Sequence, residues 1–128
     1  MRWLLDTNVL IDAFAGQSDA VRLLKALRSR NSEWIGYCAI TRLEVLGFAG
    51  LNEADEDGLR QLLAEFEEAQ ITPPVIDRAI EVRRAARIKI PDALIAATAL
   101  VYEAQLVARN ANDFRSVTGV QVVNPETS

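Results

Sequence analysis

At 128 residues and a net charge of −4, the chain has the length of one domain and can bury a hydrophobic core without a metal or disulfide staple. Half of its residues are hydrophobic and a quarter are charged, which excludes a disordered or fibrous chain. Histidine is absent and Cys38 is the single cysteine, so catalytic triads, His-based or multi-cysteine zinc sites and internal disulfides are excluded. Carboxylates remain as the groups that could carry catalysis.

The first half of the chain predicts two strands and two helices before residue 41. The first strand covers residues 2–6 and leads into a helix that stops near Gly16. Ser18 is the expected N-cap of the next helix, which ends at Asn31 and carries its apolar residues on one face. A second strand is expected over residues 33–40.

Two further helices are predicted before the middle of the chain. Thr41 and Glu44 match a capping box, which predicts a helix that begins there and ends at Gly47 or Gly50. Asn52 then opens a longer, acidic helix.

The second half of the chain repeats the alternation of strands and helices. The expected elements are a brief strand at 70–72, a helix from Pro73 to about 88, a helix at 92–103, a strand at 106–109, a helical turn around Phe114 and a strand at 120–123. The helix at 92–103 is apolar on most of its faces, so we expect it to be buried.

No repeat, low-complexity tract or linker interrupts this pattern, so we expect one domain over residues 1–128. The alternation predicts an α/β fold with a central parallel sheet of four to five strands flanked by helices on both faces. Ligands in such folds bind at the carboxyl ends of the strands.

The N-terminus gives no sign of targeting to a membrane or of secretion. Its first apolar stretch includes Asp6 and Asp12 and lacks the basic start and the cleavage site of a secretory signal. The longest apolar runs are too short to cross a bilayer. We therefore expect a cytoplasmic protein with no membrane association.

Four acids stand at strand exits or helix starts. Asp6 closes the first strand, Glu44 opens the helix after the second, Asp92 opens the buried helix and Asp113 follows the fourth strand. Each alone is equally well a capping or turn residue, because acids favour the positive end of the helix dipole. Together they would meet at one sheet edge, where like charges repel unless a cation lies between them. All-oxygen sites suit Mg²⁺ or Mn²⁺.

Basic residues are concentrated in one segment. Between Asp77 and Lys89, five basic side chains outnumber two acids, whereas seven acids accompany a single arginine between Glu53 and Glu68. The basic segment is either a face that attracts a polyanion or an ordinary solvated helix, and the sequence leaves both interpretations open.

Four blocks of sequence resemble the motifs of PIN domains, particularly those of VapC-type toxins from type II toxin–antitoxin systems. The blocks are 4–10 (LLDTNVL), 40–45 (ITRLEV), 90–99 (IPDALIAATA) and 106–114 (LVARNANDF). Their order and spacing fit the family over essentially the whole chain. The resemblance implies a single PIN-like domain.

Residue by residue, the resemblance also implies a metal site and its polar support. The implied metal-site acids are Asp6, Glu44, Asp92 and Asp113, and the supporting polar residues are Thr7, Asn8 and Asn110. In many relatives an acid stands where this chain has Asn110, and a threonine where it has Ala108. The resemblance therefore leaves open whether Asp113 or Asn110 completes the site.

The function implied by the resemblance is that of an Mg²⁺- or Mn²⁺-dependent endoribonuclease acting as a toxin, with RNA hydrolysed by metal-activated water. The implied partners are RNA, a cognate antitoxin protein and a second copy of the chain in a homodimer. From the residues themselves, Arg42, Lys89 or Arg109 is either a contact to the phosphate backbone or an ordinary solvated cation near the sheet edge. Four apolar residues fit either an antitoxin groove or the core: Val21, Leu24, Leu46 and Phe48.

Two other functions are compatible with a small acidic α/β protein. A phosphoacceptor receiver domain would carry an acidic pair after its first strand and a lone aspartate after its third, whereas Asp6 stands alone and residues 70–72 contain no acid. A non-catalytic binding module with the PIN fold would use its acidic edge to hold a basic partner.

Overall fold

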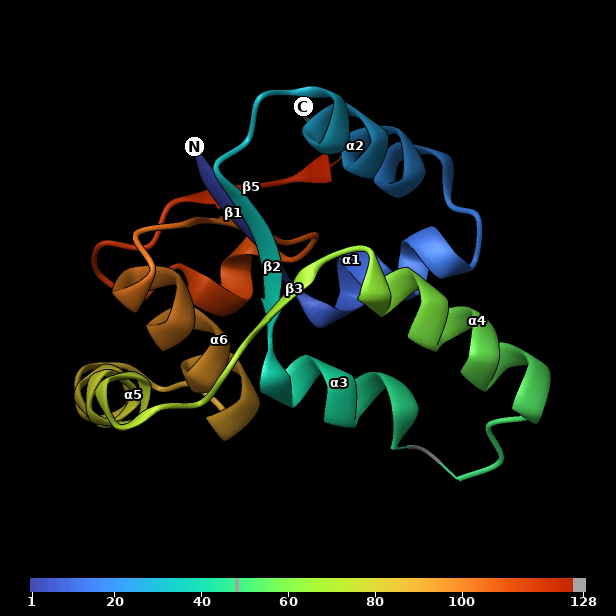
Figure 1. Ribbon diagram of the computed structural model, residues 1–128. Coiled ribbons are helices and arrows are strands. Elements are labelled where there is room, and N and C mark those ends of the chain that lie inside the picture. Colours follow the sequence, from blue (N-terminus) through green and yellow to red (C-terminus); the bar gives the residue numbers. More distant parts are fainter. Residues whose placement is uncertain (48, 126–128) are drawn as a thin grey trace.

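The computed structural model describes residues 1–47 and 49–125. Its central sheet has five parallel strands in the order β3-β2-β1-β4-β5. The strands are β1 (Arg2–Leu5), β2 (Trp34–Cys38), β3 (Glu67–Ala69), β4 (Gln105–Val107) and β5 (Val122–Val123). The predicted α/β class with a parallel sheet flanked by helices is therefore confirmed (Figure 1).

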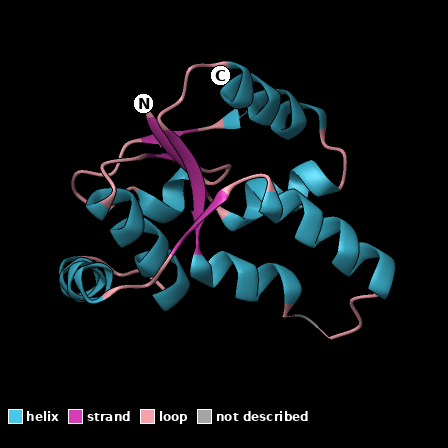
Figure 2. Cartoon of the chain, in the orientation of Figure 1, coloured by secondary structure: helices cyan, strands magenta, loops and turns pink. Residues whose placement is uncertain are grey.

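Helices connect the strands and cover both faces of the sheet (Figure 2). They are α1 (Thr7–Phe14), α2 (Ser18–Ser29), α3 (Ala39–Leu46), α4 (Glu53–Ala64), α5 (Pro73–Ala85), α6 (Ile90–Val101) and the 3-10 helix η1 (Ala111–Phe114). Helices α1, α2 and α4 pack on one face, and α5 and α6 lie on the other. No helix within the described ranges is both long and apolar enough to span a membrane.

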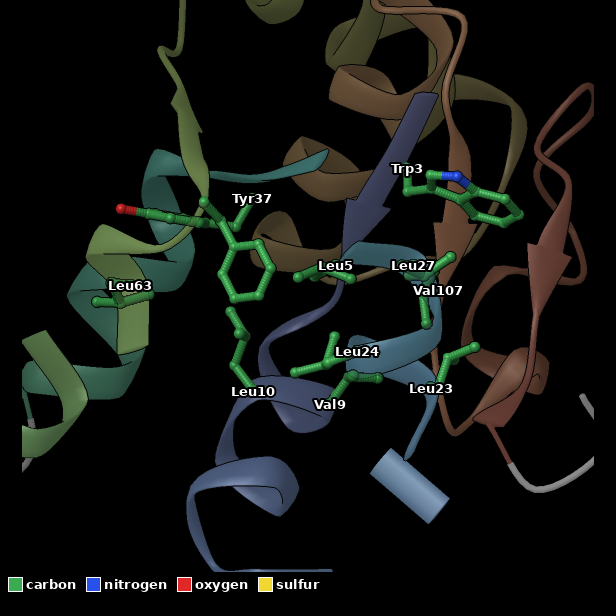
Figure 3. Packing of buried hydrophobic residues seen from close by; sticks show 11 residues of the cluster. Trp3, Leu5, Val9, Leu10, Leu23, Leu24, Leu27, Tyr37, Leu63 and Val107 are labelled. Atoms are coloured by element: carbon green, nitrogen blue, oxygen red, sulfur yellow. The ribbon is translucent and has the colours of Figure 1, made fainter. Parts of the chain in front are cut away.

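Strand β1 lies in the middle of the sheet, where its residues are buried from both sides. Leu4 pairs with Gly36 on β2 and with Leu106 on β4. Trp3 and Leu5 enter the hydrophobic cluster under α1 and α2, whereas Leu4 enters the cluster under α6. Figure 3 shows the first cluster, with Leu5 surrounded by apolar side chains. Burial on both faces explains why β1 is a continuous apolar run.

Helix α6 fills the space between the sheet and α5, which confirms the predicted buried helix. Its buried residues are Ala93, Ile95, Ala96, Ala97, Thr98 and Ala99. Small alanine side chains let α5 approach closely, with Ala97 packed against Val75 and Ala79. This packing fixes the direction in which the first turn of α6 points, and that turn carries Asp92.

The predicted strand at 70–72 is wrong, because the third strand is Glu67–Ala69. Its pairing uses backbone groups, with Glu67 opposite Gly36 and Ala69 opposite Cys38. An edge strand has one free side, and charged side chains are common there. Because this segment is acidic, it lacks the apolar pattern from which a strand is predicted.

The predicted start of the helix at Thr41 is also wrong. Helix α3 begins at Ala39, so Thr41 lies inside it and caps nothing. The Thr41 hydroxyl is buried and bonded to Thr7 instead. At α2 the N-cap is Gln17, so Ser18 is the first helical residue. At α4 the predicted cap is confirmed, because the Asn52 side chain accepts a hydrogen bond from the amide of Asp55.

Candidate active site

Asp6 lies at the centre of the carboxyl edge of the sheet. It directly follows β1, and its amide donates a 2.9 Å hydrogen bond to the carbonyl oxygen of Val107 at the end of β4. Asp6 occupies the N-cap position of α1, yet its carboxylate accepts no capping hydrogen bond. The side chain is nevertheless only 5% exposed. Capping therefore does not explain why an aspartate stands here.

Glu44 is held at this edge by a chain of two threonine hydroxyls. Thr7 Oγ1 donates to Glu44 Oε1 over 2.8 Å and lies 2.9 Å from Thr41 Oγ1. Because a hydroxyl carries one proton, Thr41 donates to Thr7 while Thr7 donates to Glu44. Thr41 and Glu44 stand three residues apart on α3, so both face the start of α1. This spacing, which resembles a capping box in the sequence, instead serves a contact between two helices.

Asp92 and Asp113 come from elements in the second half of the chain. Asp92 lies in the first turn of α6, and Asp113 lies in η1, which follows β4. Both line one pocket, together with Asn112 and Ser116. Asn110 Nδ2 donates to Asp113 Oδ1 over 3.1 Å. This hydrogen bond holds the Asp113 carboxylate against the Asn110 amide.

The three other acids act on Asp6 electrostatically. Burial is the main reason that the pKa of Asp6 rises from 3.8 to about 7, although the backbone amide of Thr7 opposes the rise. Further increases in the pKa of Asp6 come from the charges of Asp92, Glu44 and Asp113. The three other acids therefore lie near enough to Asp6 for their charges to raise its pKa.

Asp92 responds to the same surroundings. Burial raises the pKa of Asp92, and the negative charges of Asp113 and Glu44 raise it further. The positive charge of Lys89 opposes this shift. Burial first, and then the accumulated negative charge at the sheet edge, makes ionisation of both aspartates costly, and a cation would relieve that cost.

The oxygen donors fit a hard divalent ion that keeps most of its water. Within residues 1–47 and 49–125, no three Asp, Glu or Cys side chains are gathered tightly enough to enclose a metal ion. Mg²⁺ typically uses one or two carboxylates and retains several waters, so it does not require a closed cage. With no histidine in the chain, softer transition-metal sites are disfavoured.

Some of the remaining predicted residues contact the acids, and others do not. Thr7 and Asn110 hold acids, as described above. Asn8 is exposed, and in the described part of the chain no hydrogen bond ties its side chain to the acids. Thr41 was not predicted as a site residue, and its spacing from Glu44 is the one signal that could have indicated it.

Two of the three predicted phosphate-binding cations are bound to acids instead. Arg42 pairs with Glu68 over 2.5 Å. Arg109 Nε lies 2.6 Å from Asp12 Oδ2, and its terminal nitrogen lies 2.5 Å from Asp19 Oδ1. Arg109 thereby ties the end of β4 to α1 and α2. Lys89, in contrast, lines the pocket that contains Asp92 and Asp113.

A model of the PIN domain family matches residues 3–120 of the chain. The chain belongs to the PIN domain family. In this protein the PIN fold therefore consists of a five-stranded parallel sheet with acids at its carboxyl edge. Among curated protein sequences, none matches the chain significantly.

Solved structures similar to this PIN domain include chains of toxin–antitoxin complexes. A chain from a toxin–antitoxin complex of Klebsiella pneumoniae is 34% identical, with a TM-score of 0.79 over 95% of this chain and 96% of that one. A chain of FitAcB from Neisseria gonorrhoeae is 28% identical, with a TM-score of 0.79 over 98% of this chain and 99% of that one. A chain of VapBC2 from Rickettsia felis, solved with a promoter DNA fragment, has a TM-score of 0.86 over 97% and 98% at 22% identity, which shows the shared fold.

Proposed function

We propose that this PIN domain is a Mg²⁺- or Mn²⁺-dependent endoribonuclease that acts in the cytoplasm as the toxin of a toxin–antitoxin pair, with residues 1–128 forming one domain. The observation that carries the proposal is the acidic carboxyl edge of the sheet, where Asp6 is buried, Glu44 is bonded to the adjacent Thr7, and Asp92 and Asp113 line one pocket. Similarity to chains of toxin–antitoxin complexes supports the toxin assignment.

In this proposal each acid has a role that its position supports. Asp6, Asp92 and Asp113 would hold the ion directly or through its bound waters, and Glu44 would orient the attacking water or a second ion. Thr7 keeps Glu44 in place by donating to its carboxylate, and Asn110 does the same for Asp113. A bound divalent ion supplies the Lewis acidity that makes water a nucleophile near neutral pH.

The site suits hydrolysis of a phosphodiester in one step. The chain contains no histidine, and Cys38 is fully buried, so neither supplies a nucleophile or base at this edge. An in-line attack by water needs only positioning and charge stabilisation, which carboxylates and an ion provide. A covalent enzyme intermediate is therefore not part of the proposed mechanism.

Mapping of new RNA ends tests the proposed activity in a cell. The protein is induced in a sensitive host, and RNA ends are compared with those after induction of Asp6→Ala at the same protein level. The proposal predicts new ends at defined positions with the wild type and none with the variant. Identical end maps would overturn the proposed nuclease.

We also propose that a cognate antitoxin covers the acidic edge, with an arginine that pairs with the carboxylates. Exposed apolar side chains on α1 and α3 support a docking surface beside the site: Ile11, Phe14 and Leu43. Leu24 is buried in the core, and Leu46 is partly buried against it. Phe48 lies outside the described residues. Co-purification with the product of a neighbouring gene, lost with Leu43→Asp, would support this partner.

A homodimer is the second proposed assembly, and a groove between α5 and α6 supports it. Ile76, Ile80 and Ile90 are 41%, 44% and 59% exposed and line this groove with Ala93 and Leu94. Pairing of two such grooves would remove this apolar surface from water. Analytical ultracentrifugation should give a dimer for the wild type and a monomer for Ile80→Glu, whereas a wild-type monomer would refute this assembly.

A non-catalytic binding module is the main alternative function. It would use the same acidic edge to hold a basic partner without hydrolysing RNA. Two results together would favour this alternative. The wild type would cleave no RNA, and a variant with all four acids changed to amides would still bind its partner tightly. The receiver-domain alternative loses its basis, because the family match extends over residues 3–120.

A further inference from the structure

We propose that Arg87 and Lys89 form a binding site for RNA backbone phosphates directly beside the candidate active site. This inference rests on the proposed nuclease function, because it assigns the position of the substrate relative to Asp92 and Asp113. The site lies in the connection between α5 and α6, which ends at the first turn that carries Asp92.

The two cations share a pocket with two of the acids. Arg87 and Lys89 line a pocket of about 300 Å³ together with Asp92, Asp113 and Ser116. Lys89 is the N-cap residue of α6, and Asp92 lies in the first turn of the same helix. A phosphate bound by Arg87 and Lys89 would therefore lie next to the carboxylates that are proposed to act on the scissile bond.

Two other basic side chains near the sheet edge, Arg42 and Arg109, are already paired with acids. Arg42 pairs with Glu68, and Arg109 pairs with Asp12 and Asp19. Neither Arg87 nor Lys89 makes an ion pair with any carboxylate in the part of the chain that the structure describes. Their charges thus remain available to a ligand.

RNA needs such a contact to approach this protein. The chain carries a net charge of −4, and four acids crowd the candidate site, so a polyanion is repelled there. Lys and Arg beside the acids offset this repulsion and fix the register of the strand through its phosphates. The basic segment seen in the sequence therefore divides into two parts, of which Arg87 and Lys89 face the acids.

Arg83 and Arg84 belong to the other part. They line the apolar groove with Ile80 and Ile90, away from the pocket of Asp92 and Asp113. We therefore assign the phosphate contacts to Arg87 and Lys89 alone.

The test compares cleavage and binding of a labelled single-stranded RNA at several salt concentrations. The variant is Arg87→Gln with Lys89→Gln, and the control is Arg22→Gln with Lys25→Gln, which removes the same charge from α2. We expect the variant to raise KM about tenfold, to leave kcat within about threefold, and to reduce the salt slope of log(kcat/KM) by about 1. Lys89→Arg with Arg87→Lys should retain the wild-type slope.

Two results would overturn this site. One is a KM and salt slope equal to those of the α2 control, and the other is a lowered kcat with an unchanged KM. Both leave the nuclease intact. Fluorescence anisotropy separates the two proposals, because RNA binding that depends on Arg87 and Lys89 in a chain that cleaves nothing would overturn the nuclease and support the phosphate site.

Discussion

Thr7 Oγ1 donates a 2.8 Å hydrogen bond to Glu44 Oε1, which joins the first residue of α1 to the second turn of α3. Because Thr41 donates in turn to Thr7, the carboxylate of Glu44 is fixed by groups that follow two neighbouring strands. The relationship makes the position of Glu44 depend on a buried hydroxyl rather than on its own exposed side chain.

Thr7→Val should separate this positioning from general stability. The substitution keeps the side-chain shape but removes the donor to Glu44 and leaves the Thr41 hydroxyl without its partner, which costs about 1–3 kcal/mol of unfolding free energy. Activity should fall about tenfold in kcat, and Thr7→Ser should restore most of it. The matched control is Thr98→Val, which removes the buried hydroxyl that bonds to Leu94 on α6. If Thr98→Val lowered kcat as much as Thr7→Val does, this would contradict the role of Thr7 in positioning Glu44.

The pKa of Asp6 predicts a metal-free protein that is less stable at high pH. The folded pKa of about 7 lies above the ordinary 3.8, so the folded state binds more protons between these values. The contribution of Asp6 to the free energy of unfolding is therefore fully present below about pH 4. It is lost as the pH rises to about 7, by about 4 kcal/mol at most. Urea denaturation in EDTA measures this decline.

Asp6→Asn provides the comparison for the pH profile. The amide does not titrate, so the free energy of unfolding of the variant should fall much less with rising pH. At pH 8 the variant should therefore be more stable than the wild type. Asp77→Asn, at an exposed position on α5, should reproduce the wild-type profile. Parallel profiles for wild type and Asp6→Asn would show that burial of Asp6 does not govern the pH dependence.

Most of the candidate site could be predicted from the sequence because it depends on topology. Asp6 and Asp113 follow strands, and parallel strands place their carboxyl ends at one edge, so the alternation of elements was sufficient. The hydrogen bond from Asn110 to Asp113 required the structure, because the sequence does not show which side chains of this turn face each other.

The errors arose where tertiary contacts determine the role of a residue. Thr41 and Glu44 have the spacing of a capping box, but their partner is Thr7, which lies 34 residues from Thr41 along the chain. Glu67 and Glu68 belong to an edge strand that pairs through its backbone, so no apolar pattern marked it. Local patterns cannot reveal either contact.

Arg109 should prove important for stability although it is not an acid of the site. Arg109→Met removes the partner of Asp12 and Asp19, whose side chains are only 29% and 17% exposed, and leaves two like charges close together. We expect a clear decrease in the midpoint of urea denaturation. Arg60→Met, which breaks an exposed pair with Glu56, should change the midpoint little. Equal shifts for the two variants would show that the Arg109 contacts contribute no more than a surface pair.

A divalent ion should stabilise the protein most where the acids are ionised. Mn²⁺ competes with protons for Asp6 and Asp92, so the rise in Tm on adding Mn²⁺ should be larger at pH 8 than at pH 5. Asp6→Asn with Asp92→Asn should remove the rise. An equal rise in this double variant would place the bound ion elsewhere.

The most direct test of the central claim is the cleavage of a labelled single-stranded RNA by the purified protein, with Mg²⁺ or Mn²⁺ and with EDTA. We expect cleavage with the metal, none in EDTA, and a rate lower by on the order of 100-fold for Asp92→Asn. Equal cleavage in EDTA, or an unchanged rate for Asp92→Asn, would contradict a metal-dependent nuclease built on these four acids.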